Sequence, residues 1–218
     1  MSFIRDDWIQ QQLHLRQSEY TTLQKMNVLT GTWNVNAKKP LLPSEASKML
    51  AWLQRGSAEG SLPDIVALGF QEIVDLNAVN VMVNNMSSQR ASQWEEAILA
   101  TLNQQMSQNQ YRLVMSKTLV GIQLVVCVKV DHFDHVRDVC GATAGVGIMG
   151  MMGNKGGAAI RMSFYDSTVC FVCAHLAAHR ENVAGRNADY MNILSKIDFK
   201  ESNEYPSNDM RCVLMMHL

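Results

Sequence analysis

The 218-residue sequence lacks a clear excess of charge of either sign. It holds 19 Lys and Arg against 20 Asp and Glu, a formal net charge of −1 at pH 7. Such a chain has no basic field to attract nucleic acid, so its charge indicates no nucleic-acid partner. No apolar run reaches transmembrane length, and the N-terminus lacks the basic region and apolar stretch of a secretory signal. We therefore expect one ordinary globular domain located in the cytoplasm.

Disulfide bonds are not expected either. The five cysteines are an odd number, and most lie in apolar, strand-like runs, which is typical of reduced, buried thiols. Cys170 and Cys173 have C-x-x-C spacing, but in a strand two such side chains face opposite sides of the sheet. This predicts buried thiols rather than a redox pair.

Alternating strand and helix patterns predict an α/β domain with a mixed sheet. Residues 1–26 are polar and are expected to precede the core as a lead-in segment. A helix is expected to begin near Ser92, which has Glu95 in the capping-box position. The other helices are expected at 46–53 and 180–197. Strands are expected at 27–33, 64–70, twice within 111–130 with a turn or bulge near Gly121, and at 158–164, 168–173 and 211–216.

Six glycines surround Lys155 within residues 145–157. Glycine lets backbone N–H groups turn toward an anion, and Lys155 adds a positive charge, so the segment predicts a phosphate-binding loop. A Walker loop is excluded because Gly156 stands where Ser or Thr is required, and a dinucleotide loop because a strand pattern follows. The alternative is a flexible hairpin. Four apolar residues form the expected tip and suggest contact with a membrane, although the chain is rich in methionine throughout: Ile148, Met149, Met151 and Met152.

Polar side chains follow three of the expected strands: Asn34, Glu72 and His175. Strand ends can meet at one rim of an α/β sheet, where sites usually lie. A carboxylate such as Glu72 suits Mg²⁺, which takes few protein oxygens and keeps waters, but a solvated strand end is an equal alternative. Asn34 could orient the metal or a phosphate, or simply form a turn. His179 lies four residues after His175, but no Glu lies between them, so a zinc protease is not expected and we assign His179 no catalytic task.

Four segments in this order resemble the inositol polyphosphate 5-phosphatases of the synaptojanin and Lowe-syndrome-protein type. They are 31–36 (GTWNVN), 64–72 (DIVALGFQE), 153–157 (GNKGG) and 174–179 (AHLAAH), with weaker support from 73–77 and 186–190. The resemblance covers about residues 20–200. It implies the four-layer α/β sandwich of DNase I-like proteins, with residues 27–218 forming the N-terminal part of the catalytic domain.

The resemblance also implies an activity and a set of roles. The activity is Mg²⁺-dependent hydrolysis of the 5-phosphate of inositol polyphosphates and of lipids such as phosphatidylinositol 4,5-bisphosphate, peripherally at membranes. Asn34 and Glu72 would serve the magnesium site, and His175 would contact the scissile phosphate. Asn154 and Lys155 would hold another phosphate of the headgroup.

Two later segments of that family are missing from the sequence: Gly-Asp-Leu-Asn-Tyr-Arg and Trp-Cys-Asp-Arg. In the family they supply the aspartate that activates water and the residues that read the 4-phosphate. We therefore expect a C-terminally truncated domain. The alternative function is a catalytically inactive fragment that only binds phosphoinositide or a partner. A related nuclease is disfavoured by the near-zero net charge and the apolar loop tip.

Overall fold

The structure is a computed structural model that describes residues 2–40, 46–54, 63–75, 84–104, 111–147, 154–199 and 210–217. The helices are α1 (Ser2–Leu15), α2 (Gln17–Tyr20), α3 (Ala46–Gln54), α4 (Asn84–Gln104), α5 (Val130–Phe133) and α6 (Val183–Lys196). The strands are β1 (Val28–Asn34), β2 (Ile65–Gln71), β3 (Tyr111–Leu119), β4 (Ile122–Lys129), β5 (Val136–Gly145), β6 (Gly156–Phe164), β7 (Ser167–His175) and β8 (Met210–His217).

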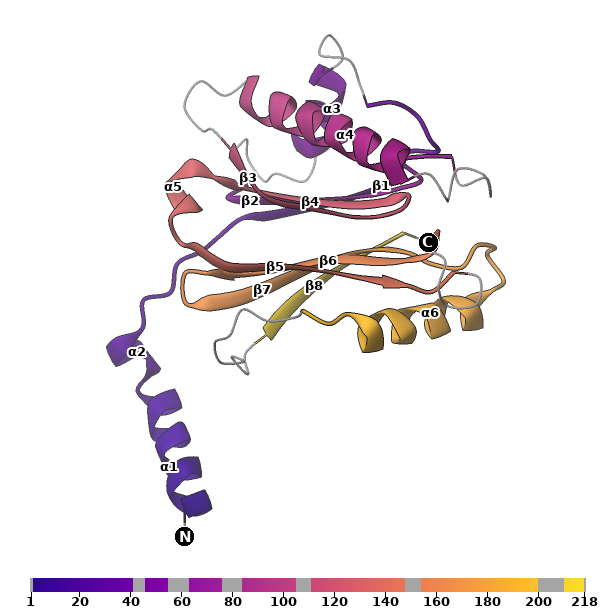
Figure 1. The fold of residues 1–218 in the computed structure, drawn as a ribbon. Helices are drawn as coiled ribbons and strands as arrows, with labels where there is room; N and C mark the ends of the chain where they lie inside the picture. Colours follow the sequence, from indigo (N-terminus) through magenta and orange to yellow (C-terminus); the bar gives the residue numbers. More distant parts are fainter. Residues whose placement is uncertain are drawn as a thin grey trace.

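The strands form two sheets that lie face to face (Figure 1). One has the order β1-β2-β4-β3 and the other β5-β6-β7-β8. Helices α3 and α4 cover the outer face of the first sheet, and α6 covers the outer face of the second. Each sheet contains one parallel pair, β1 with β2 and β7 with β8, beside antiparallel neighbours. The four layers and the mixed sheets confirm the DNase I-like α/β sandwich.

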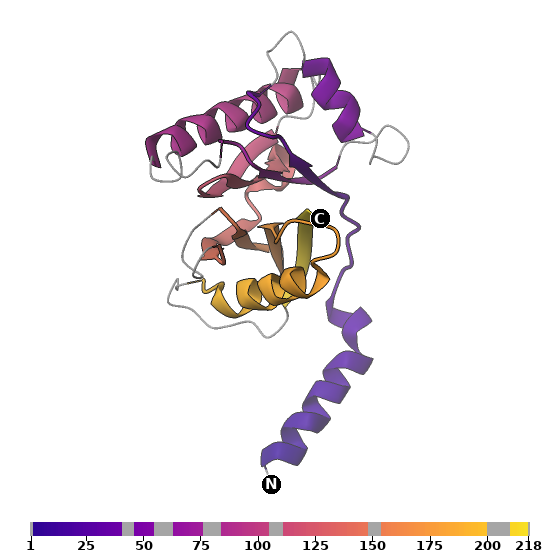
Figure 2. The same cartoon turned by 90° about the vertical axis from the view of Figure 1, so that its right-hand side faces the viewer.

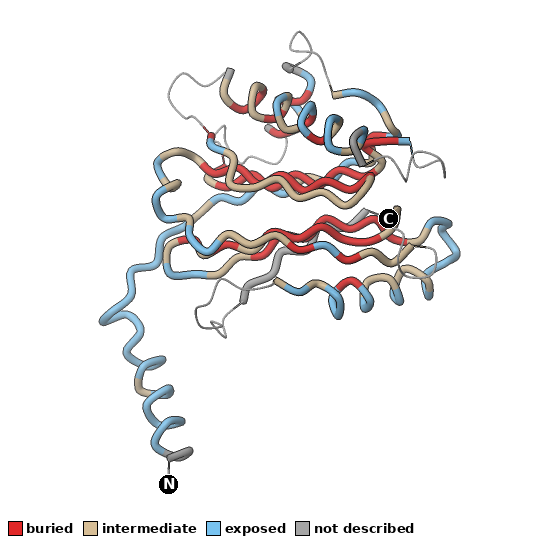
Figure 3. Tube along the Cα trace, in the orientation of Figure 1, coloured by how far each residue is buried: buried red, intermediate tan, exposed pale blue. Residues whose placement is uncertain are grey.

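The core is built from strands that are buried on both faces (Figure 3). All seven residues of β2 are buried, as its nearly continuous apolar sequence predicts. Ile65 and Ala67 face the space between the sheets, where Phe171 of β7 packs with them. Phe70 faces the other way and stacks on Trp94 of α4, with ring centroids 4.8 Å apart. This alternation places every second residue of a strand in the layer between the sheets.

The expected strands are confirmed, with bounds that shift by a few residues at most. One helix boundary is wrong, because α4 begins at Asn84 and Ser92 lies inside it. Its first two turns are polar, so the apolar period that reveals a helix starts only at the buried Ala91 and Trp94. The lead-in segment forms α1 and α2, which project from the sandwich (Figure 2).

Three of the cysteines agree with the expectation of buried thiols. Cys127, Cys170 and Cys173 are free and buried, whereas Cys140 is partly exposed. Cys170 packs beside α6 and Cys173 between the sheets, so the two thiols do face opposite sides of β7. Among the described residues, no helix is long and apolar enough to cross a membrane.

Candidate functional site

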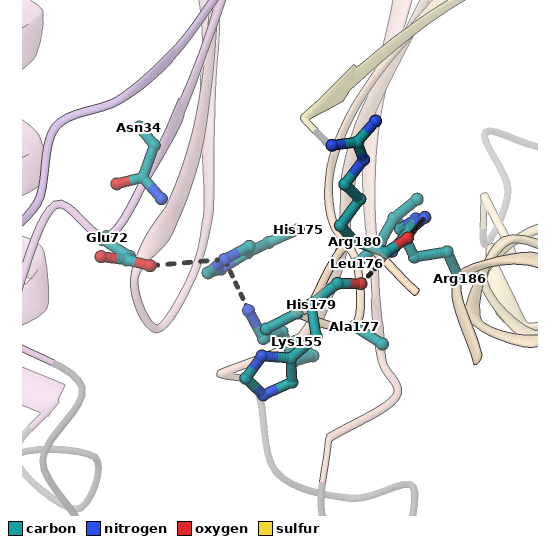
Figure 4. A pocket seen from close by; sticks show the side chains of 10 residues that line it. Asn34, Glu72, Lys155, His175, Leu176, Ala177, His179, Arg180 and Arg186 are labelled. Atoms are coloured by element: carbon teal, nitrogen blue, oxygen red, sulfur yellow. Dashed lines mark hydrogen bonds and ion pairs between the residues drawn. The ribbon is translucent and has the colours of Figure 1, made fainter. Parts of the chain in front are cut away.

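The three polar strand ends meet at one rim of the sandwich. Asn34 ends β1, Glu72 directly follows β2, and His175 ends β7. β1 and β2 are parallel and in register to their last residues, so Asn34 and Glu72 emerge side by side. Together with Lys155 they line a pocket of about 470 Å³ that lies between the two sheets (Figure 4). The structure thus brings the three predicted strand ends together, although they come from two sheets rather than from one.

Glu72 reaches the pocket because the backbone turns sharply after β2. Its φ is 55°, a left-handed conformation that is uncommon outside glycine. Its carbonyl accepts a hydrogen bond from the N–H of Ala37 at 2.7 Å, which joins the loops after β1 and β2. Its carboxylate Oε1 lies 3.5 Å from Nε2 of His175. The turn therefore brings a carboxylate from one sheet to a histidine from the other.

Lys155 and His175 form a short polar contact in the pocket. Nζ of Lys155 lies 2.6 Å from Nε2 of His175, and only 3% of His175 is exposed. An ammonium group can only donate, so in this contact the charged Lys155 donates and Nε2 of His175 accepts. Burial lowers the pKa of Lys155, while the carboxylates of Glu72 and Asp189 act in the opposite direction. A partly desolvated cation thus faces the pocket.

Asn34 forms the turn that was one of the two roles left open by the sequence. Its Oδ1 accepts a hydrogen bond from the N–H of Asn36 at 3.0 Å, so it does form a turn. Figure 4 shows its amide nitrogen on the side toward His175. In this arrangement Asn34 offers the pocket a hydrogen-bond donor, which suits a phosphate oxygen better than a cation.

The segment after β7 forms a wall of the pocket that sequence reasoning largely missed. His179, Arg180 and Arg186 line it, and His179 adopts a φ of 75°. The guanidinium of Arg186 donates to the carbonyl oxygens of His179 and Arg180, which holds the segment in place. The N–H of Ala177 donates to Oδ2 of Asp189 at 2.8 Å. The wall adds two arginines to a pocket that already contains Lys155.

The comparisons with known proteins agree with this geometry. Residues 31–216 match the family described as "Endonuclease/Exonuclease/phosphatase family 2". The chain belongs to this family. Synaptojanin-2 of Rattus norvegicus is 34% identical over 205 residues, and type II inositol 1,4,5-trisphosphate 5-phosphatase of Mus musculus is 33% identical over 198 residues. The alignments cover 89% and 91% of this chain but only 13% and 18% of those relatives.

A solved structure shows the same fold within the family. It is the inositol polyphosphate 5-phosphatase domain of SPsynaptojanin, in complex with inositol (1,4)-bisphosphate and a calcium ion. The TM-score is 0.77 and the identity 26%, and the similarity covers 96% of this chain and 57% of that one. The expected resemblance to inositol polyphosphate 5-phosphatases is confirmed.

Not every predicted site residue of this family member lies at the pocket. Asn154 does not line it, and its Oδ1 is buried with no hydrogen-bond partner among the described residues. The four residues of the expected membrane contact lie outside the described residues: Ile148, Met149, Met151 and Met152.

The donor groups of the pocket fit a metal that needs few protein ligands. Within the described ranges, no three His, Cys, Asp or Glu side chains gather into a metal-binding group. Glu72 offers a carboxylate that is 30% exposed. Mg²⁺ is commonly held by one or two carboxylates and keeps several waters. Glu72 would hold such an ion, with the amide of Asn34 beside it.

Proposed function

We propose that this pocket serves the Mg²⁺-dependent removal of the 5-phosphate from inositol polyphosphates and phosphoinositides. The observation that carries the proposal is the meeting of Glu72, His175 and Lys155 at the ends of strands from two sheets. The names of the similar proteins support the substrate class, because they are 5-phosphatases and one solved domain holds inositol (1,4)-bisphosphate.

The residues of the pocket can share the work of binding. Lys155 and the amide of Asn34 would donate to phosphate oxygens, and His175 would contact the phosphate that is removed. Arg180 and Arg186 make the far wall positive and favour a substrate with more than one phosphate. A Mg²⁺ ion at Glu72 would neutralise charge that develops on the transferred phosphoryl group and its leaving oxygen.

A second candidate function is binding without turnover. Among the described residues that line the pocket, Glu72 supplies the sole carboxylate, and a metal would occupy it. Hydrolysis also needs a group that takes a proton from the attacking water, and loss of such a base typically lowers the rate by about 10²–10⁴-fold. For this 218-residue chain we therefore expect binding without measurable release.

One experiment separates the two candidates. Inositol 1,4,5-trisphosphate is titrated into the chain by calorimetry with Mg²⁺, and phosphate release is followed in the same solution. Heat of binding with release supports hydrolysis, and heat of binding without release supports the second candidate. If neither is seen, the pocket does not recognise inositol phosphates and both candidates are wrong.

Action at a membrane surface is a separate part of the proposal, together with a cytoplasmic location. Its support is the apolar composition of the glycine loop. Two methionines that insert partly into lipid would contribute on the order of 1–3 kcal/mol. The double change Met151→Ser and Met152→Ser should then weaken binding to vesicles that contain phosphatidylinositol 4,5-bisphosphate. Binding of soluble inositol 1,4,5-trisphosphate should not change, and equal losses in both assays would contradict membrane contact.

A further inference from the structure

A buried glutamine joins the three strands that carry the site. Gln71 is the last residue of β2 and is fully buried. Its Nε2 lies 3.0 Å from Oγ1 of Thr32 on β1 and 3.3 Å from Sγ of Cys173 on β7, and donates to both. The thiol of Cys173 donates in turn to the carbonyl oxygen of Phe70 on β2, at 3.7 Å. We call Gln71 with Thr32 and Cys173 the Gln71 bridge.

Each member of the Gln71 bridge precedes a site residue by one or two positions in the sequence. Thr32 is two residues before Asn34, and Cys173 is two residues before His175. Residues two apart in a strand point to the same face, so both pairs project into the layer between the sheets. Gln71 itself directly precedes Glu72. The bridge therefore lies one residue layer below the pocket and links the sheet of Glu72 to the sheet of His175.

The Gln71 bridge is an unfavourable choice if its only task is stability. Oε1 of Gln71 is buried and has no hydrogen-bond partner among the described residues. A buried acceptor without a partner destabilises the folded state, whereas an apolar side chain of similar size removes that penalty. Such a buried group calls for an explanation beyond packing, and the position of Gln71 directly below the pocket offers one.

We propose that Gln71 is a positioning residue that fixes the relative placement of Glu72 and His175. It acts through Thr32 and Cys173, and does not touch substrate or metal itself. The inference rests on the proposed function, because it concerns how the same pocket binds its ligands. The bridge aligns the two sheets with each other, which the hydrogen bonds within each sheet cannot do.

The chain contains a matched control for this inference. Gln123 on β4 is also fully buried, and its Oε1 also has no partner among the described residues. Its Nε2 donates to the carbonyl oxygen of Ala91 at 2.9 Å and to Oγ of Ser116 at 3.1 Å. It therefore connects β4 to α4 and β3, on the opposite face of the sheet from the pocket. The same substitution at both positions therefore separates an effect on the alignment of the site from an effect on the stability of the fold.

The test compares the unaltered chain with Gln71→Met and Gln123→Met. Calorimetry gives the affinity for Mg²⁺ and for inositol 1,4,5-trisphosphate. Thermal unfolding gives the midpoint temperature of unfolding of each variant. We expect Gln71→Met to bind about 10–100-fold more weakly, the range found when residues that orient metal ligands are removed. Gln123→Met should bind like the unaltered chain, and the two midpoints should be similar.

Other results overturn the inference. Unchanged affinity in Gln71→Met contradicts positioning but leaves the proposed function intact, whereas an unaltered chain that binds neither probe overturns both. A midpoint temperature for Gln71→Met far below that of Gln123→Met would make the bridge a structural feature only.

A second pair of variants tests the link to β7. Cys173→Ser keeps a donor and an acceptor and should retain affinity, whereas Cys173→Val should lose it, and equal affinities would contradict the link.

Discussion

In the proposed function, phosphate recognition depends most directly on Lys155. It is partly buried, it touches His175, and it faces a carboxylate and two arginines across the pocket. A buried lysine is costly to keep charged, and a bound phosphate would offset that cost through a charge-assisted hydrogen bond. The pocket therefore favours an anionic ligand such as a phosphate.

Replacing Lys155 with Ala should weaken binding of inositol 1,4,5-trisphosphate about tenfold or more, since a hydrogen bond between charged groups contributes about 1.5–3 kcal/mol. The pH dependence gives a second signature. Lys155 must be protonated to hold phosphate, and burial places its pKa below 10.5. Affinity should therefore fall as the pH rises through this lowered pKa. Calorimetry across alkaline pH measures the fall, and its persistence in Lys155→Ala would contradict the role of this lysine.

Sequence reasoning found the residues that follow a clear local pattern. Glu72 and His175 stand out because each follows a buried apolar run, and Lys155 because glycines surround it. Arg186 could not be given a role, because its guanidinium binds backbone carbonyls whose position only the fold determines. Gln71 lies within the segment 64–72 that carries the family resemblance. Its contacts could not be predicted, because its hydrogen-bond partners lie 39 and 102 residues away in the sequence.

At the scale of elements, Asp64 anchors the end of β2 that is opposite to the pocket. Its carboxylate accepts hydrogen bonds from the N–H of Asn27 and from Nζ of Lys129, both at 2.8 Å. His132 of α5 lies 3.5 Å away. Burial alone raises the pKa of Asp64, but the hydrogen bonds from Asn27 and Lys129 and the nearby positive charges outweigh it, so the pKa lies below its usual 3.8. The carboxylate thus ties together β1, β2, β4 and α5.

Changing Asp64 to Asn should lower the free energy of unfolding at neutral pH by about 2 kcal/mol, the loss of hydrogen bonds to a charged group. Because the folded-state pKa is depressed, this stabilisation is complete above pH 3.8 and is lost as the pH falls through the folded pKa. Urea unfolding at several pH values measures the difference, which should shrink below about pH 4. Asp166→Asn, at an exposed turn, is the control. A constant difference down to the lowest pH would show that the charge of Asp64 is irrelevant.

The elements themselves were predictable where one pattern dominates. The nearly continuous apolar sequence of β2 predicts a buried strand, and the two-residue turn after β3 predicts a hairpin. The start of α4 was not predictable, because its first residues are Asn, Ser and Gln, which also favour turns. Their helical state depends on the burial of Ala91 and Trp94 later in the helix.

For the whole molecule, the open edges of the sheets predict its behaviour in solution. In the described part of the chain, β1 and β8 each pair with a neighbour on one side only, and the two strands lie near each other. Val28 on β1 is 45% exposed and Trp33 is 39% exposed. Unpaired strand edges with apolar side chains readily pair with other chains.

We therefore expect the 218-residue chain to associate as its concentration rises. Sedimentation velocity over a wide concentration range measures this directly. A single monomeric species throughout, with cooperative thermal unfolding, would show that both edges are well protected. Lysine substitution at Val28 should reduce association if the edge of β1 takes part.

For the whole molecule, we propose that strand ends from two sheets form one Mg²⁺-assisted polyphosphate site. The most direct test is the affinity of the chain for inositol 1,4,5-trisphosphate, measured by calorimetry with Mg²⁺ and with EDTA, at concentrations below association. We expect tighter binding with Mg²⁺ in the unaltered chain, and equal, weaker binding under both conditions in Glu72→Gln, since the amide keeps the shape but lacks the charge that Mg²⁺ prefers. The same enhancement by Mg²⁺ in Glu72→Gln would show that Glu72 does not hold the ion, and would contradict the proposed site.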